Sequence, residues 1–152
     1  MIRIFLTGYM GAGKTTLGKA FARELNIPFI DLDWYIEERF HKSIRELFIE
    51  RGEASFREPC FSDNMEYMND NGQTVFLDVH PDVLFRRLRV ATQQRPILQG
   101  KTDEELRAFI IEALEKRAPH YGKARYCFDA GQLESRRQIA DSVQQLRSLL
   151  GI

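Results

Sequence analysis

The sequence has few cysteines, no long apolar run and no excess of one charge. Cys60 and Cys127 are its two cysteines, and they lie far apart, without the spacing of a metal-binding pair. We expect both thiols to be buried and reduced, as in a cytoplasmic protein. No apolar run approaches the ~20 residues of a membrane span, and we expect no signal peptide, because Met1 leads directly into a predicted strand. These scarcities argue against a secreted, disulfide-linked or membrane-spanning protein.

The charges of the chain cancel. Its 152 residues include 22 Lys or Arg and 22 Asp or Glu. A chain without net charge has no overall attraction to nucleic acid or to an anionic membrane, so we expect neither as a partner. Any anion must therefore be bound by a local site. The length fits a single domain, residues 1–152, with a core of its own.

Residues 8–16 read Gly-Tyr-Met-Gly-Ala-Gly-Lys-Thr-Thr and match the phosphate-loop pattern of Gly, four residues and Gly-Lys-Thr. Glycines let backbone N–H groups close around a polyphosphate. Lys14 would bring a cation to the outer phosphates, and Thr15 would offer a hydroxyl to Mg²⁺. The loop follows a predicted strand at 2–7 and opens a predicted helix at Lys14–Leu25, whose positive end faces the anion. A plain Gly-rich turn would give Lys14 and Thr15 no role.

A second short strand is predicted at Phe29-Ile30, and it ends in Asp31-Leu32-Asp33. Two carboxylates two residues apart on an extended segment point the same way. They would lie at the carboxyl end of a parallel strand, where open α/β sheets bind ligands. One would serve Mg²⁺ through water and the other a substrate hydroxyl. The alternative is a turn in which Asp33 caps the next helix.

The rest of the chain alternates between helical and strand patterns, which predicts an α/β fold: a mostly parallel sheet with helices on both faces. Residues 92–102 have no clean periodicity and include Arg95, so we interpret them as a mobile loop between two helices. Strands are predicted at 74–79 and 126–129, and helices at 34–40, at 43–51 with a capping box at Ser43 and Glu46, from Asp63, from Pro81, from a capping Asp103 to Arg117-Ala118-Pro119, and at 135–150.

Five motifs follow one another in a specific order: the phosphate loop, Asp31-Leu-Asp33, Arg51-Gly-Glu-x-x-Phe-Arg57, Arg95-Pro-Ile-Leu98 and Arg117-Ala-Pro-His-Tyr121. This order resembles the shikimate kinase family over nearly the whole chain. The resemblance implies a P-loop kinase fold with strand order 2-3-1-4-5, substrate-binding helices at about 33–62 and a lid at about 92–102. It further implies a monomeric cytoplasmic enzyme of aromatic amino acid biosynthesis. The implied reaction is phosphorylation of shikimate at its 3-hydroxyl by ATP, with Mg²⁺ as cofactor.

The resemblance also implies a nucleotide site. Thr15 would bind Mg²⁺, and Asp31 would support the ion through water. Arg95 would come down from the lid onto the phosphates and neutralise charge on the transferring group. Arg136 is a candidate for stacking on adenine. The residues implied to hold the phosphates are Gly11, Ala12, Gly13, Lys14, Thr15 and Thr16.

On the substrate side, the resemblance implies that Asp33 bonds the shikimate hydroxyls, including the one that attacks. Arg57 and Arg117 would hold the carboxylate, because a planar guanidinium matches a carboxylate in a bidentate way. By pattern alone, a solvated helix arginine is the favoured interpretation of Arg57. The implied catalytic residues are Lys14, Asp33 and Arg95.

The chain departs from the family between Glu58 and Pro59. There the family has a third strand and a Gly-Gly-Gly stretch that lines the shikimate site, and roughly twenty residues are missing here. In the implied strand order, the third strand joins the second to the first, so its loss leaves buried backbone groups without partners. Two explanations stay open: the molecule contains a segment that the written sequence omits, or the protein is genuinely shortened and impaired.

Two alternative functions also stay open. A kinase for another small polyol acid, such as gluconate, fits the paired arginines and Asp33 equally well. A catalytically impaired nucleotide-binding module fits the missing Gly-Gly-Gly stretch.

Overall fold

The computed structural model describes residues 2–32, 37–38, 41–43, 46, 64–91 and 99–152. None of the helices in these ranges is long and apolar enough to cross a membrane. The elements described are β1 (Ile4–Thr7), α1 (Lys14–Leu25), α5 (Asn64–Asn71), β2 (Gln73–Asp78), α6 (Pro81–Ala91), α7 (Asp103–Tyr121), β3 (Tyr126–Asp129) and α8 (Arg136–Leu150).

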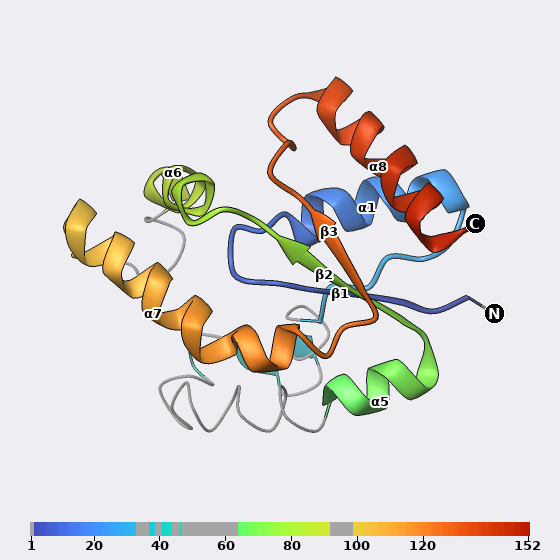
Figure 1. The fold of residues 1–152 in the computed structure, drawn as a ribbon, viewed down its shortest axis with the longest axis horizontal. Helices are drawn as coiled ribbons and strands as arrows, with labels where there is room; N and C mark the ends of the chain where they lie inside the picture. Colours follow the sequence, from blue (N-terminus) through green and yellow to red (C-terminus); the bar gives the residue numbers. More distant parts are fainter. Residues whose placement is uncertain (1, 33–36, 39–40, 44–45, 47–63, 92–98) are drawn as a thin grey trace.

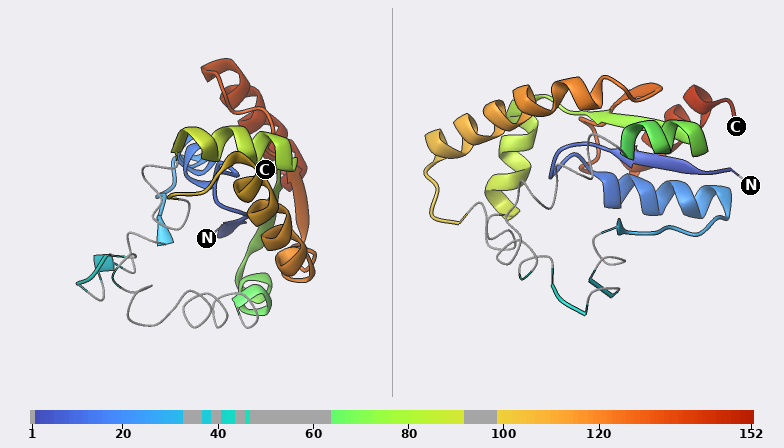
Figure 2. Two further views of the ribbon diagram at one scale, coloured as in Figure 1. Left: turned by 90° about the vertical axis from the view of Figure 1, so that its left-hand side faces the viewer. Right: turned by 90° about the horizontal axis from the view of Figure 1, so that it is seen from below.

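The three described strands form one parallel sheet in the order β1-β2-β3. Leu6 lies opposite Val75, and Leu77 lies opposite Phe128. Parallel neighbours need long crossover connections, which the helices between the strands supply. Helices α1 and α8 lie side by side on one face of the sheet, and α7 runs along the other (Figures 1 and 2). This three-layer arrangement confirms the predicted α/β fold class.

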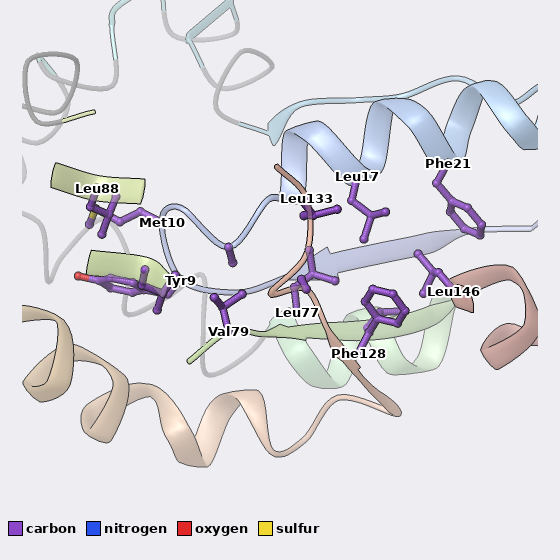
Figure 3. Close-up of a cluster of buried hydrophobic side chains, with 14 of the residues drawn as sticks. Tyr9, Met10, Leu17, Phe21, Leu77, Val79, Leu88, Phe128, Leu133 and Leu146 are labelled. Atoms are coloured by element: carbon purple, nitrogen blue, oxygen red, sulfur yellow. The ribbon is translucent and has the colours of Figure 1, made fainter. Parts of the chain in front are cut away.

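The main core lies between the sheet and the pair α1 and α8 (Figure 3). Alternate residues of β2 point to this side, so Val75 and Leu77 are almost fully buried. Leu17 of α1 and Leu146 of α8 are each 0% exposed. Phe76 faces the other side and stacks on Tyr121 of α7, with ring centroids 4.6 Å apart. Both faces of β2 are therefore covered.

The helix ends mostly follow their predicted signals. Helix α1 has the predicted bounds, and α8 begins after Ser135, whose hydroxyl accepts from the Gln138 N–H at 3.1 Å. The prediction that Asp103 caps α7 is wrong, because Thr102 is the cap residue and accepts from the Glu105 N–H. Helix α7 also continues past its predicted end, with Pro119 inside its last turn. The proline lacks one backbone N–H donor of the helix. Tyr121, two residues further on, is buried and stacks on Phe76.

The predicted second strand is absent. Residues 27–31 are described, and Phe29-Ile30 pairs with no strand there. Within the described ranges β1 pairs on one side only, with β2, and its four residues are only partly buried. Phe29 packs closely on α1, since a Cβ at Gly18 would come within 2.6 Å of its ring, but the Ile30 side chain is 71% exposed. Among the described residues, no strand lies between Phe29-Ile30 and β1.

The segment that follows Phe29-Ile30 is described in part. The capping box is confirmed: the Ser43 N–H donates to Glu46 Oε2 at 2.9 Å, and the Glu46 N–H donates to Ser43 Oγ at 3.2 Å. Most of the predicted substrate-binding helices at 33–62, and residues 92–98 of the predicted lid, lie outside the described residues.

Cys127 is exposed, so its predicted burial is wrong, while Cys60 lies outside the described residues. Residues alternate across a strand, and Phe128 takes the inward position on β3. Cys127 therefore points away from the main core. The burial that its thiol retains, together with the nearby carboxylates of Asp78 and Asp129, raises the pKa of Cys127 above its ordinary value.

Candidate active site

The phosphate loop joins the carboxyl end of β1 to α1 (Figure 1). Gly11 (φ 82°) and Gly13 (φ 98°) have left-handed backbone conformations that favour glycine. A Cβ at Gly13 would also lie 2.3 Å from Cδ1 of Leu133, so Leu133 would have to move to admit a side chain. Gly13 precedes the first residue of α1, whose unpaired N–H groups face the loop. The motif thus has the backbone shape that phosphate binding needs.

Lys14 folds back over this loop. Its Nζ donates to the carbonyl oxygens of Gly8 at 2.5 Å and Tyr9 at 3.3 Å. The Ala12 N–H also donates to the Tyr9 carbonyl, at 3.0 Å, which closes the loop into a tight turn. The ammonium group is therefore held at the mouth of the loop, where phosphate oxygens would lie.

Thr15 and Asp31 come together from different parts of the chain. The Thr15 hydroxyl lies 3.3 Å from Asp31 Oδ2 and donates to it. Two oxygens at this spacing suit Mg²⁺, which takes one or two protein oxygens and completes its shell with water and substrate phosphates. The described part of the chain has no cluster of three acidic, His or Cys side chains that would hold a metal by itself. The pair therefore fits a magnesium ion that arrives with a nucleotide.

Arg117 lies beside the phosphate loop although it comes from α7. Its Cζ is 5.0 Å from the centroid of the Tyr9 ring, a cation–π distance. The structure thus brings this predicted carboxylate ligand close to the residues that follow β1. Its predicted partners Asp33, Arg57 and Arg95 lie outside the described residues.

Arg136 opens α8 and lines a groove between α1 and α8. The same groove is lined by Thr16 at the start of α1, so the predicted adenine-stacking residue and the end of the phosphate loop share one surface. Other residues that line this groove are Lys19, Arg23, Glu24 and Ile139.

Arg87 of α6 is a contact of the phosphate loop that the sequence analysis missed. Its guanidinium donates to the carbonyl oxygen of Gly11 at 3.0 Å. The neighbouring Arg86 and Arg89 are exposed, and nothing in the sequence pattern distinguishes Arg87 from them. Only the packing of α6 against the loop shows the difference.

A parallel sheet whose first strand ends in a glycine loop, with the loop lysine and a hydroxyl–carboxylate pair at one edge, defines a P-loop nucleotide-binding protein. The family model described as "Shikimate kinase" matches residues 10–61 and 59–147. The chain belongs to the shikimate kinase family, as its motifs predict, and so to the phosphotransferases.

Individual relatives agree. The chain is 66% identical to a shikimate kinase of Bacteroides thetaiotaomicron, with 99% of each chain covered, and 45% identical to one of Parabacteroides distasonis, with 99% and 100% covered. The crystal structure of the shikimate kinase from Bacteroides thetaiotaomicron superposes with a TM-score of 0.93 at 65% identity, covering 99% of each chain. The Acinetobacter baumannii shikimate kinase in complex with shikimate gives a TM-score of 0.76 at 26% identity, covering 97% and 92%.

The same comparisons support the prediction that this chain lacks a stretch of residues that its relatives have. The alignment with the Bacteroides thetaiotaomicron relative has 173 positions, which exceeds the 152 residues of this chain by 21. At least that many positions of the relative have no residue here. The two stretches that match the family meet at residues 59–61, next to the junction of Glu58 and Pro59.

Proposed function

We propose that this chain transfers the γ-phosphoryl group of ATP to the 3-hydroxyl of shikimate, with Mg²⁺ as cofactor. The observation that carries the proposal is the phosphate loop with its Lys14 contacts and the Thr15–Asp31 pair, in a chain 66% identical to a shikimate kinase. The Acinetobacter baumannii relative in complex with shikimate supports the choice of substrate.

In the proposed reaction, the residues of the loop bind and orient the nucleotide. The N–H groups at the start of α1 face the phosphates, and Lys14 exchanges its carbonyl contacts for the outer phosphate oxygens. Thr15 and Asp31 would hold Mg²⁺, which neutralises charge on the phosphates when it is bound. Little covalent chemistry is required of the protein, so positioning accounts for most of the rate.

On the substrate side, Arg117 extends from α7 toward the loop and is the proposed grip on the shikimate carboxylate. The proposed partners are Arg57 for the carboxylate, Asp33 for the attacking hydroxyl, and Arg95 for the phosphates. An arginine that closes over the site also excludes water, which would otherwise hydrolyse ATP.

A specific observation favours a second candidate, a nucleotide-binding module that does not transfer phosphate. At least 21 aligned positions of the Bacteroides thetaiotaomicron relative have no residue in this chain, and the strand predicted at Phe29-Ile30 does not form. Arg57 precedes the junction by one residue. If the arginines that bind the carboxylate are displaced by ~1 Å, the rate falls about a hundredfold. This second candidate therefore predicts that nucleotide binding is retained and that transfer to shikimate is weak or lost.

The deciding experiment follows ADP release by the 152-residue chain with ATP and Mg²⁺, with and without shikimate, beside the Bacteroides thetaiotaomicron relative as a control. Phosphorus NMR of the product identifies a shikimate phosphate ester. Shikimate-dependent release supports the kinase, whereas ADP binding without it supports the module. Release that depends on gluconate instead would favour a different polyol acid.

Two substitutions test the proposed roles of the aspartates. Asp31→Ala should raise the Mg²⁺ concentration that half-saturates the reaction, while Asp33→Ala should lower shikimate turnover and leave nucleotide affinity near that of the unchanged chain. Isothermal titration with ADP and Mg²⁺, and then with shikimate, separates the two. An equal loss of nucleotide affinity in both variants would contradict this division.

A further inference from the structure

The guanidinium of Arg117 lies over the ring of Tyr9, the second residue of the phosphate-loop motif. The Arg117 Cζ is 5.0 Å from the ring centroid, within the distance at which the face of an aromatic ring attracts a cation. Tyr9 is 1% exposed and Arg117 is half-buried. The contact is therefore sheltered from water, where this attraction is strongest.

Tyr9 is fixed through both its backbone and its side chain. Its carbonyl oxygen accepts from Lys14 Nζ at 3.3 Å and from the Ala12 N–H at 3.0 Å. Its ring belongs to the buried apolar cluster that also contains Val79 and Leu88 (Figure 3). The position of the ring is therefore set by the fold of the phosphate loop, and the ring offers a rigid surface to the arginine.

Helix α7 is docked by contacts of its own on either side of Arg117. Tyr121, one turn further on, stacks on Phe76 with ring centroids 4.6 Å apart. Ile110, two turns before Arg117, is 1% exposed. These contacts hold the helix backbone, so the contribution of Tyr9 is to the direction of the Arg117 side chain. A long side chain that is already placed loses less conformational freedom when it binds a ligand.

We propose that Tyr9 is a positioning residue for Arg117: its ring holds the guanidinium beside the phosphate loop, where it meets the carboxylate of the acid substrate. Tyr9 acts through the arginine and does not touch the reacting atoms. The phosphate loop would then serve both substrates, the nucleotide through its backbone and the acid through this side chain. The inference rests on the proposed role of Arg117 in binding the shikimate carboxylate.

The first measurement needs no ligand. In nitrogen-15 NMR spectra of the labelled chain, the Nε–H resonance of Arg117 is identified by its loss in Arg117→Lys. A ring above or below this group shifts its proton resonance. Tyr9→Leu should abolish that shift and speed the exchange of this proton with water, whereas Tyr9→Phe should retain both, because the ring remains.

The second measurement is shikimate affinity by isothermal titration in the presence of ADP and Mg²⁺. Tyr9→Leu should raise the Kd for shikimate about three- to tenfold, the size expected for loss of a sheltered cation–π contact. Tyr9→Phe should stay within about threefold of the unchanged chain. ADP affinity should change little in either variant, because Lys14 and Ala12 contact the backbone carbonyl of residue 9, which both substitutions keep.

A matched control makes the same aromatic-to-aliphatic change elsewhere in the core. Phe128 is 6% exposed and lies well apart from Tyr9 (Figure 3). Phe128→Leu should therefore leave the Arg117 resonance and the shikimate Kd unchanged. Thermal melts report the folded fraction of each variant. If Tyr9→Leu does not fold, Tyr9→Met takes its place, because a flexible methionine fills an irregular space without an aromatic ring.

Three outcomes would overturn the inference. The first is an unchanged Arg117 resonance in folded Tyr9→Leu. The second is an equal displacement of that resonance in Phe128→Leu, which would indicate a general change of the core. The third is an unchanged shikimate Kd in Tyr9→Leu. If the unchanged chain binds no shikimate, the proposed substrate itself fails, and the NMR comparison alone then decides whether Tyr9 positions Arg117.

Discussion

The nucleotide side of the molecule and the segment that follows α1 differ in how completely they are built. In the first, β2 is paired on both sides and buried on both faces, and two helices seal the main core. In the second, Phe29 is the packed residue of a stretch that joins no strand, and Ile30 is 71% exposed. The two regions meet at β1. The phosphate loop forms from adjacent residues, whereas a strand forms in a sheet only when its pairing partners are also present.

The first prediction concerns Lys14, the lysine of the phosphate loop on the nucleotide side. Lys14→Ala should lower turnover by about a hundredfold or more, because losing a charged group at a preorganised site costs on the order of 3–4 kcal/mol. Coupled ADP-release assays measure this, and Lys123→Ala, an exposed lysine that follows α7, is the control. Near-full turnover in Lys14→Ala would reject the phosphate-loop assignment.

The second prediction repairs the incomplete region. Inserting between Glu58 and Pro59 the residues that the Bacteroides thetaiotaomicron relative has at this point should raise kcat/KM for shikimate about a hundredfold, by returning the carboxylate clamp to its place. ADP affinity should change little, because the phosphate loop is already formed. A Gly/Ser linker of equal length is the matched control. If the linker restores activity equally, length and not the third strand is what is missing.

The third prediction compares stability in the two regions. Leu146→Ala should lower the free energy of unfolding by about 2–5 kcal/mol, since this side chain is 0% exposed in the main core. Ile30→Ala should cost less than about 0.5 kcal/mol, as surface substitutions do. Urea unfolding measures both, with Leu149→Ala, 41% exposed on the same helix as Leu146, as the control. Equal costs at 146 and 30 would show that residue 30 is buried in solution.

The smallest effect is expected at Cys127. Because burial and the nearby carboxylates raise the pKa of Cys127, its thiolate fraction at pH 8 should be smaller than that of an ordinary thiol. Iodoacetamide labelling followed by mass spectrometry should therefore give a lower rate at pH 8 than that of a free cysteine in an unstructured peptide, and the rate should rise with pH. Labelling as fast as the peptide would contradict the raised pKa. ADP affinity should be unchanged by Cys127→Ser.

The sequence predicted what depends on neighbouring residues. The phosphate loop, the bounds of α1 and the Ser43–Glu46 capping box each follow from a few adjacent positions. The family resemblance also implied that Thr15 and Asp31 serve the same Mg²⁺ ion, and their side-chain oxygens lie 3.3 Å apart.

Features that depend on distant partners were not predictable in the same way. The sequence indicated a strand at Phe29-Ile30 from composition alone, but these residues pair with no strand in the described part of the chain. The outward position of Cys127 depends on which side of β3 faces the core. Arg87 looks like any helix arginine until α6 is docked on the phosphate loop. In each case, tertiary packing decides what the local pattern leaves open.

The bonds from Lys14 to the Gly8 and Tyr9 carbonyls have a consequence for the thermodynamics of ligand capture. Because these bonds hold the loop in shape from within the chain, little backbone entropy is left to lose when a nucleotide binds. The lysine instead exchanges one set of oxygen partners for another. Phosphate binding then replaces one set of polar partners by another and requires no folding of the loop. We expect the binding free energy to be mainly enthalpic, with a small change in heat capacity.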